Sequence, residues 1–379
     1  MQRATSGVGA TTAVIAGLAA LAAGMGIGRF ALTPLLPAME GVSLAQGSAL
    51  AASNYAGYLA GSIACGLVRV PPGNLAKWGL AGVGASTLAM GVTTAFGAWL
   101  VWRFVAGVAS ALVLIGTAAW ALRKLAESDR ARWAGGVFSG VGVGIAFAGA
   151  LVLAVLALHG DAREGWLALG SAAAVAAVLA WRPLSSTSSL APEAPKKAAP
   201  LDRDAWLLVV CYSAFGLGYI VPATYLPLLA KRVLDDPAQI GLVWPVFGLA
   251  AACSTLVVSY LASKPRRAWA AAHGVMAIGV AASSFGTGAA MLVVGAVCVG
   301  STFMVVTMTG LQEARRVGGA SGTRLMAAMT SAFAAGQLAG PLLVIGLADR
   351  PQAFAVAGGI AAAFLAASAV ALAVTSSGR

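Results

Sequence analysis

The sequence predicts an all-α membrane protein with twelve transmembrane helices in two pseudo-symmetric six-helix halves. The first observation is composition: 60% of the 379 residues are apolar and only 9% are charged, whereas soluble proteins carry about 25% charged residues. The second is that apolar runs recur along the whole chain, each long enough to cross the roughly 30 Å hydrocarbon core as a helix. The third is an internal repeat that relates the two halves. These observations exclude a soluble enzyme.

Each predicted helix is an apolar run bounded by charged residues, Pro or Gly. The alternation expected of membrane β-strands is absent from these runs. The first run is too long for the roughly 7–15-residue core of a cleaved signal peptide, so we expect it to remain as the first helix. The expected spans are 10–38, 47–68, 76–95, 98–122, 133–158, 165–182, 204–230, 238–262, 268–286, 289–312, 323–348 and 353–374.

Basic residues in the loops fall mainly on one side of this topology. On the opposite side there are only Arg163, Lys231, Arg232 and Arg350. Lys and Arg retain loops in the cytoplasm, so we expect a multi-pass protein of the bacterial inner (plasma) membrane with both termini in the cytoplasm. This bias also explains the net charge of +12, and no continuous basic face predicts binding to nucleic acid. The expected partners are the lipid bilayer and a small-molecule substrate, and we expect a monomer.

A Pro- and Ser-rich segment divides the chain. Residues 183–203, PLSSTSSLAPEAPKKAAPLDR, hold four prolines and too little apolar surface to fold. They predict a cytoplasmic linker, with a regulatory or partner-binding segment as the alternative. The predicted domains are an N-terminal six-helix bundle (1–182) and a C-terminal six-helix bundle (204–379).

The two halves repeat each other at an offset of 190 residues. This offset places Gly26-Ile27-Gly28 on Gly216-Leu217-Gly218 and Leu36-Pro37 on Leu226-Pro227. Two halves related by a parallel repeat are typical of secondary transporters of the major facilitator type.

Three stretches carry a resemblance to a known family. They are GMGIGRFALTPLLPAM (24–39), SNYAGYLAG (53–61) and WRFVAGVASALVL (102–114). With them the chain resembles the bacterial YbfB/YjiJ-type branch of the major facilitator superfamily (MFS). The resemblance implies the MFS fold and a transporter, but no substrate.

One further motif agrees with the superfamily and two depart from it. RFVAG (103–107) matches the superfamily's Arg-x-x-x-Gly pattern in the fourth helix. The loops at 66–78 and 259–269 lack the Asp that the superfamily usually carries there, which puts its usual cytoplasmic gating interaction in doubt. The GxxxGP pattern of drug antiporters occurs at Gly336–Pro341, in the eleventh helix instead of the fifth. It therefore does not indicate drug antiport.

Two arginines lie well inside predicted spans. A charged side chain at mid-helix costs at least about 2.5–3.5 kcal/mol, so Arg29 and Arg103 need a reason to be there. Two guanidinium groups at similar depth would suit a carboxylate or another small oxyanion. The alternative for Arg103 is a structural role, in which it binds helix-end carbonyl groups or Asn54.

Other polar side chains in the spans could complete the binding site. Tyr219 is the counterpart of Arg29 under the 190-residue offset, so it could face the same cavity from the second half. The predicted substrate-binding residues are Arg29, Arg103, Asn54, Tyr58, Tyr219 and Gln337. Hydrogen bonding between helices is the alternative role for the uncharged ones.

No acidic residue is clearly inside a span, which disfavours a cationic substrate and leaves proton coupling without an obvious relay. Facilitated diffusion, anion exchange and a relay through Glu40, Glu313 or His159 remain open. The predicted gate lies at the cytoplasmic ends of the fourth and tenth helices. It consists of Arg123, Lys124, Glu313 and Arg315, which we expect to pair between the halves when the protein opens outward.

No cofactor or metal site is predicted. The four cysteines lie in apolar runs and form no CxxC pair; they are Cys65, Cys211, Cys253 and Cys298. Soft thioether ligands suit Cu(I), and two Met pairs share helix faces, Met304 with Met308 and Met326 with Met329. Methionine is also ordinary packing material.

These features together predict a secondary active or facilitative transporter of a small, anionic organic solute, working by rocker-switch alternating access. Efflux of a drug or metabolite is the first alternative, and Cu(I) import is a weaker one. A membrane sensor or scaffold is the alternative from another class. An enzyme is not expected, because the spans lack a catalytic acid, base or metal cluster.

Overall fold

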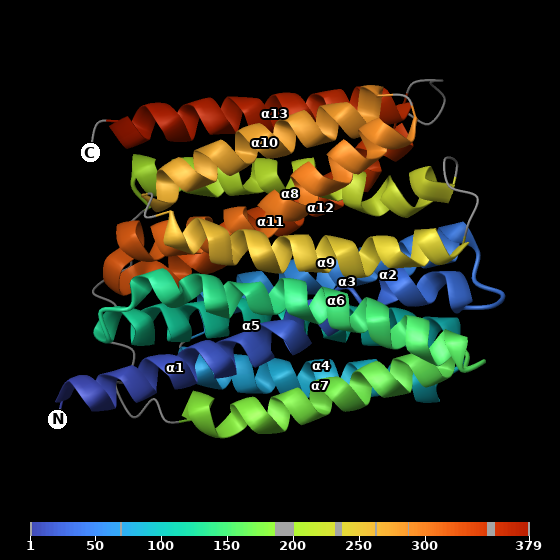
Figure 1. Cartoon of the computed structure of the whole chain (residues 1–379), viewed down its shortest axis with the longest axis horizontal. Coiled ribbons are helices and arrows are strands. Elements are labelled where there is room, and N and C mark those ends of the chain that lie inside the picture. The colour runs from blue at the N-terminus through green and yellow to red at the C-terminus, as the bar shows by residue number, and fades with distance from the viewer. Residues whose placement is uncertain are drawn as a thin grey trace.

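The computed structural model describes residues 2–68, 70–185, 201–231, 237–261, 264–286, 288–346 and 353–377. Within these ranges every regular element is helical, and twelve long helices lie side by side in one bundle (Figure 1). The all-α fold class is therefore confirmed.

The helices agree with the predicted spans. The first half contains α1 (Gln2–Leu21), the π-helical η1 (Ala22–Ile27), α2 (Leu32–Leu35), η2 (Leu36–Ala38), α3 (Leu44–Leu67), α4 (Pro72–Val92), α5 (Phe96–Glu127), η3 (Ala131–Trp133), α6 (Ala134–Ala157) and α7 (Ala162–Ser185). The second half contains α8 (Arg203–Lys231), α9 (Pro237–Tyr260), α10 (Pro265–Phe285), α11 (Ala289–Gly318), η4 (Gly319–Ser321), α12 (Gly322–Gly346) and α13 (Ala353–Ser377).

The helix boundaries differ from the prediction in several places. The first span is interrupted near its middle, whereas Pro34 and Pro37 predict a distortion only at its outer end. Helix α7 continues through Pro183 to Ser185, and α8 begins at Arg203, so both helices enter the predicted linker. Residues 186–200 of that linker lie outside the described residues.

Hydropathy alone identifies fewer spans than the structure contains. Among the described residues, seven stretches are long and apolar enough to cross a membrane, and one of them, Val293–Gly340, runs through both α11 and α12. Helix α3 is not among them, because polar residues such as Asn54 lower its hydropathy. Large apolar side chains such as Ile15, Val178 and Phe364 are exposed on the outside of the bundle, as expected of a surface that faces lipid.

Two helix pairs join the first six spans to the last six. Helix α6 packs along α9, and α3 packs along α12. Under the 190-residue offset α3 corresponds to α9 and α6 to α12, so the two contacts are equivalent, as a two-fold relation between the halves requires.

The α6–α9 contact depends on glycine. A Cβ atom on Gly142 would lie 2.4 Å from the Gly248 carbonyl oxygen and 2.4 Å from the Ala252 nitrogen. Only Gly allows the two backbones to approach this closely.

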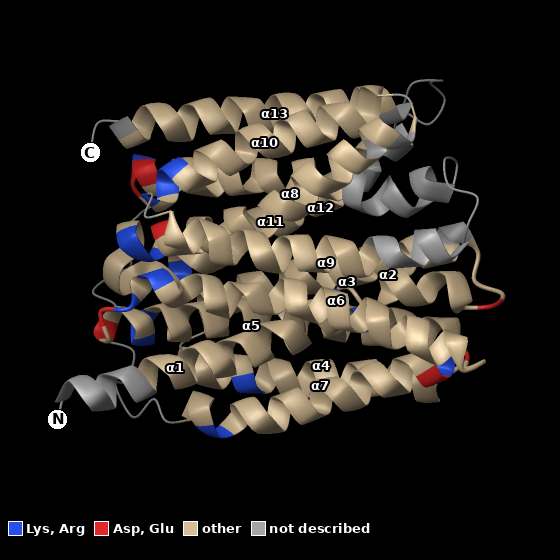
Figure 2. Cartoon of the chain, viewed as in Figure 1, with Lys and Arg blue, Asp and Glu red and all other residues tan. Residues whose placement is uncertain are grey.

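Charged side chains lie at the ends of the bundle. Figure 2 shows Lys and Arg gathered mainly at the end where both termini lie, while most of the length of the helices carries no charge. The interior of the bundle therefore contains few charged groups, and these define the candidate site.

Candidate functional site

The first span breaks where the candidate site begins. The Gly28 amide donates to the Ala23 carbonyl at 3.0 Å, the five-residue spacing of a π-helical turn. Because Pro34 has no N–H, the Phe30 carbonyl accepts instead from Thr33 at 3.2 Å. In a regular helix the Thr33 amide would bind the Arg29 carbonyl, so the break leaves that oxygen for another donor.

Arg103 provides this donor. From α5 its Nη2 donates to the Arg29 carbonyl at 3.1 Å and its Nη1 to the Gly28 carbonyl at 3.2 Å. The side chain is 2% exposed. Both Nη atoms of its guanidinium are thus used to hold the broken segment, which agrees with the structural alternative for Arg103.

Asn54 forms a hydrogen bond with the backbone of Arg103. Its Nδ2 donates to the Arg103 carbonyl at 3.0 Å. Gly107 allows this approach of α3 and α5, because a Cβ there would lie 2.1 Å from the Asn54 carbonyl oxygen. In the Arg-x-x-x-Gly pattern, Arg103 therefore binds the broken first span, and Gly107 allows α5 to pack closely on α3.

The guanidinium of Arg29 lies between the two halves. Its Nη2 donates to Gln337 Oε1 of α12, and its Cζ lies 3.9 Å from the ring centroid of Tyr58 in α3, within cation–π range. Tyr219 of α8 is within side-chain hydrogen-bonding reach of the same guanidinium. The structure therefore brings four predicted site residues together, Arg29, Tyr58, Tyr219 and Gln337, while Arg103 and Asn54 lie behind them.

Three polar atoms of this cluster are buried without a hydrogen-bond partner: Arg29 Nη1, Tyr58 Oη and Gln337 Nε2. Each of the three can donate a hydrogen bond. Their residues are at most 3% exposed. Buried polar groups are normally satisfied, so the arrangement is that of a site for a hydrogen-bond acceptor.

The charge of Arg29 has no acidic partner in the part of the chain that the structure describes. The ion pairs there involve Arg123, Lys124, Arg266 and Arg316. The centre of the bundle is therefore electropositive, and it favours an anion.

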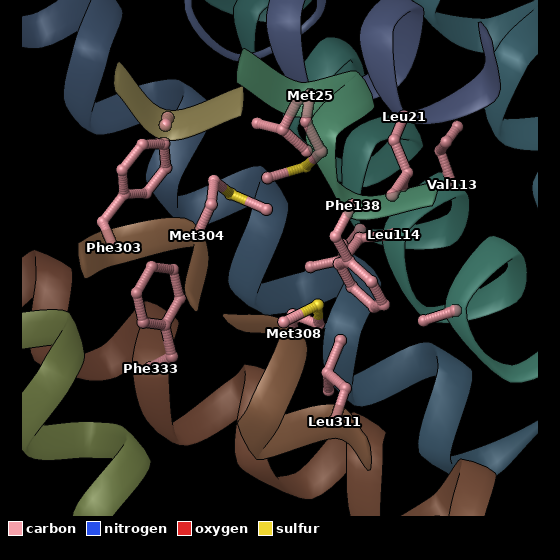
Figure 3. Packing of buried hydrophobic residues seen from close by; sticks show 14 of the residues in the cluster. Leu21, Met25, Val113, Leu114, Phe138, Phe303, Met304, Met308, Leu311 and Phe333 are labelled. Atoms are coloured by element: carbon pink, nitrogen blue, oxygen red, sulfur yellow. The ribbon is translucent and has the colours of Figure 1, made fainter. Parts of the chain in front are cut away.

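Aromatic rings of the second half border the cluster. Phe333 and Phe303 both stack against Tyr219, with ring centroids at 6.0 Å and 5.6 Å. In Figure 3 Phe303 and Phe333 lie one above the other beside the packed apolar core. This role was not predicted from the sequence, because phenylalanine is ordinary in membrane helices.

The comparisons with known proteins can be set beside this geometry. A family model described as "Uncharacterised MFS-type transporter YbfB" matches residues 21–374. The chain belongs to this family. No curated protein matches its sequence. Among solved structures, the human organic anion transporter MFSD10 (TETRAN) is similar with a TM-score of 0.74 and 13% identity, over 96% of this chain and 98% of that chain. At this identity the likeness shows the fold.

Membership in the YbfB-like MFS family confirms the predicted resemblance, the MFS fold and the transporter class. The chain is a membrane-embedded transporter of a small molecule and not an enzyme.

In this structure the ion pairs of Glu313, one of the predicted gate residues of this MFS transporter, lie within the second half. Arg266 donates to Glu313 from α10 at 2.7 Å and Arg316 from its own helix at 2.7 Å. Arg266 also binds Asp204 of α8 at 2.8 Å, an ion cluster that the sequence did not reveal.

The residues predicted opposite Glu313 have other partners. Arg123 and Lys124 pair with Glu127 on their own helix at 3.4 Å and 3.8 Å. Of the predicted gate, Arg315 is the one whose electrostatic neighbours, Arg123 and Glu127, lie in the other half.

Between the Arg29 cluster and the helix ends that carry Glu313 and Arg123, apolar side chains join the two halves. Leu114 and Phe138 of the first half share one buried cluster with Met308 and Leu311 of the second (Figure 3). Met304 belongs to the same cluster, and the Met308 sulfur accepts from the Ser259 hydroxyl at 3.7 Å. These methionines therefore lie in packed apolar surroundings.

Proposed function

We propose that this chain is a secondary active or facilitative transporter of a small organic anion, with Arg29 as the principal anion ligand. The observation that carries the proposal is the set of three unpartnered donors, Arg29 Nη1, Tyr58 Oη and Gln337 Nε2, around a buried charge without an acidic partner. A carboxylate would neutralise the charge and satisfy these donors at once. The structurally similar MFSD10 is described as an organic anion transporter, which agrees with a substrate of this charge.

The three hydrogen-bond donors come from both halves, which supports rocker-switch alternating access. Arg29 and Tyr58 belong to the first half and Gln337 to the second, so a bound carboxylate would hold the halves together at the centre. The ligand would thereby favour the closed arrangement over the open ones. The α6–α9 and α3–α12 contacts are the surfaces on which residues 1–182 and 204–379 would rock, joined by the 183–203 linker.

The proposed location is the bacterial inner membrane, with both termini in the cytoplasm and the protein acting as a monomer. The gathering of basic residues at the end that carries both termini supports this orientation (Figure 2).

Thermal unfolding of the detergent-purified chain tests the substrate class. The ligands are benzoate, other small carboxylates, phosphate, tetraphenylphosphonium as an organic cation, and Cu(I). A ligand at 100 times its dissociation constant stabilises the folded protein by about 2.7 kcal/mol. We expect stabilisation by at least one carboxylate in wild type and none in Arg29→Gln. Stabilisation by the cation or Cu(I) alone would contradict the proposal.

A further inference from the structure

Five aromatic rings of the second half form a continuous column beside Arg29. In order they are Phe333, Tyr219, Phe303, Phe247 and Trp244, with consecutive centroids 6.0, 5.6, 5.2 and 5.4 Å apart. Their interplanar angles are 17°, 12°, 23° and 3°. The four helices α8, α9, α11 and α12 supply these rings, so the stacking reflects tertiary packing and not one helix face.

One ring of the first half packs on this column. Phe30 lies edge-on to Phe303, with ring centroids 6.3 Å apart and an interplanar angle of 83°. It also lies edge-on to Trp244, at 6.1 Å and 63°. Edge-to-face packing at this distance is a favoured aromatic geometry. Because Phe30 follows Arg29 in the chain, the guanidinium and a ring already meet the second half as a pair.

The same side-chain pair indicates how a substrate would bind. The Arg29 guanidinium carbon lies 6.0 Å from the Phe30 centroid and 5.8 Å from the Phe333 centroid. A carboxylate bound to Arg29 Nη1 would therefore place the group attached to that carboxylate beside the ring column. A planar ring that displaces the Phe30 side chain, while Arg29 stays in place, can take over its contacts with Phe303 and Trp244.

The two guanidinium groups differ in the terminal nitrogens that they offer to such a ligand. Both Nη atoms of Arg103 bind the Gly28 and Arg29 carbonyls, and only its Nε is unpartnered. Arg29 instead has a terminal nitrogen, Nη1, without a partner. A site with one free terminal nitrogen matches one carboxylate.

We infer that the substrate is an aromatic monocarboxylate, held by Arg29 at its carboxylate and by the ring column at Phe303 and Trp244. This inference rests on the proposed transport of an organic anion and specifies its chemical class.

Binding of two matched acids to the purified full-length protein tests the inference. Benzoate and cyclohexanecarboxylate carry the same number of carbon atoms and one carboxylate, and both are ionised at neutral pH, but only benzoate is aromatic and flat. We expect benzoate to bind about tenfold more tightly by calorimetry, which corresponds to about 1.4 kcal/mol. Equal affinities, or tighter binding of the saturated acid, would overturn the inference.

Two variants test whether the ring column causes the preference for benzoate over cyclohexanecarboxylate. In Phe303→Leu we expect the affinity ratio to fall to about two or less, because the leucine cannot make the aromatic contact. Trp244→Leu serves the same purpose if Phe303→Leu does not give a monodisperse protein. Phe364→Leu is the control, since Phe364 is 54% exposed on the outside of α13, and it should keep the wild-type ratio. A wild-type ratio in both column variants would contradict the inference.

Arg29→Gln separates the two proposals. If wild type binds both acids equally and Arg29→Gln binds neither, the organic-anion proposal stands and the aromatic class is wrong. If neither acid binds wild type while another small carboxylate stabilises it, the aromatic class is wrong. If Arg29→Gln binds both acids normally, the proposed function itself fails.

Discussion

At the scale of single residues, the two buried arginines have different partners. Arg29 points its free Nη1 into the contact between the halves, whereas Arg103 donates to two carbonyl groups of the broken first span. Sequence position could not separate these roles, because both side chains occupy the same kind of apolar span. Measurements of thermal stability and of carboxylate binding should separate the roles of the two arginines.

We predict that Arg103→Gln is destabilised and that Arg29→Gln is not. Loss of Arg103 leaves the Gly28 and Arg29 carbonyls without their donor, at a cost of about 1–3 kcal/mol each. Loss of Arg29 removes a buried charge that has no acidic partner in the described residues, which costs little. Thermal unfolding of both variants measures the difference. A stable Arg103→Gln that no longer binds carboxylates would instead make Arg103 a ligand.

Gln337 offers a test by charge. Gln337→Glu would place a carboxylate against Arg29, which already binds the Gln337 side chain, so the variant should no longer bind external anions. We expect a loss of more than about tenfold in benzoate affinity, because like charges brought together cost several kcal/mol. The neutral control Gln337→Met has a similar length and should lose less. Wild-type affinity in Gln337→Glu would show that the anion binds elsewhere.

At the scale of helices, glycine controls how closely α6 and α9 approach. In Gly142→Ala the new Cβ would clash with the α9 backbone at Gly248 and Ala252, so the helices must separate. We expect a loss of about 1–3 kcal/mol in stability together with slower uptake. The control Gly274→Ala lies in α10 with nothing within 4 Å of its Cβ, and it should gain up to about 1 kcal/mol. Equal behaviour of the two variants would show that the α6–α9 contact is not tight.

The ion cluster at one end of α8, α10 and α11 is also a property of helices. Glu313 is 1% exposed and joins Arg266 to Arg316. Glu313→Gln leaves Arg266 with part of its counter-charge, so we expect a loss approaching the roughly 3–5 kcal/mol that breaking a buried ion pair costs.

Glu127→Gln is the matched control for this prediction, because Glu127 is 51% exposed in its pairs. It should cost at most about 1 kcal/mol. Equal melting temperatures for the two variants would show that Glu313 contributes no more than a surface ion pair.

At the scale of the whole molecule, the sequence predicted the helices well because the bilayer imposes a strong rule. Apolar runs near the hydrocarbon thickness, separated by charge, Pro and Gly, can be located without an alignment. Pro34 and Pro37 predict a distortion at the outer end of the first span. The position of the break was not predictable, because it depends on Arg103 reaching the freed Arg29 carbonyl from another helix.

The candidate site was predictable only in part. Arg29 and Gln337 stood out because charge and amide groups are costly in a membrane, and the repeat offset pointed to Tyr219. The partners of Glu313 and the ring column were not predictable, because they join residues from three or four helices at distances that only the packing sets.

Uptake of labelled benzoate into proteoliposomes measures whether this chain transports an organic anion through a site built on Arg29. We expect saturable uptake by wild type, competition by other carboxylates but not by tetraphenylphosphonium, and background uptake by folded Arg29→Gln. Uptake by Arg29→Gln at the wild-type rate, or transport of the cation in place of benzoate, would contradict the proposed function.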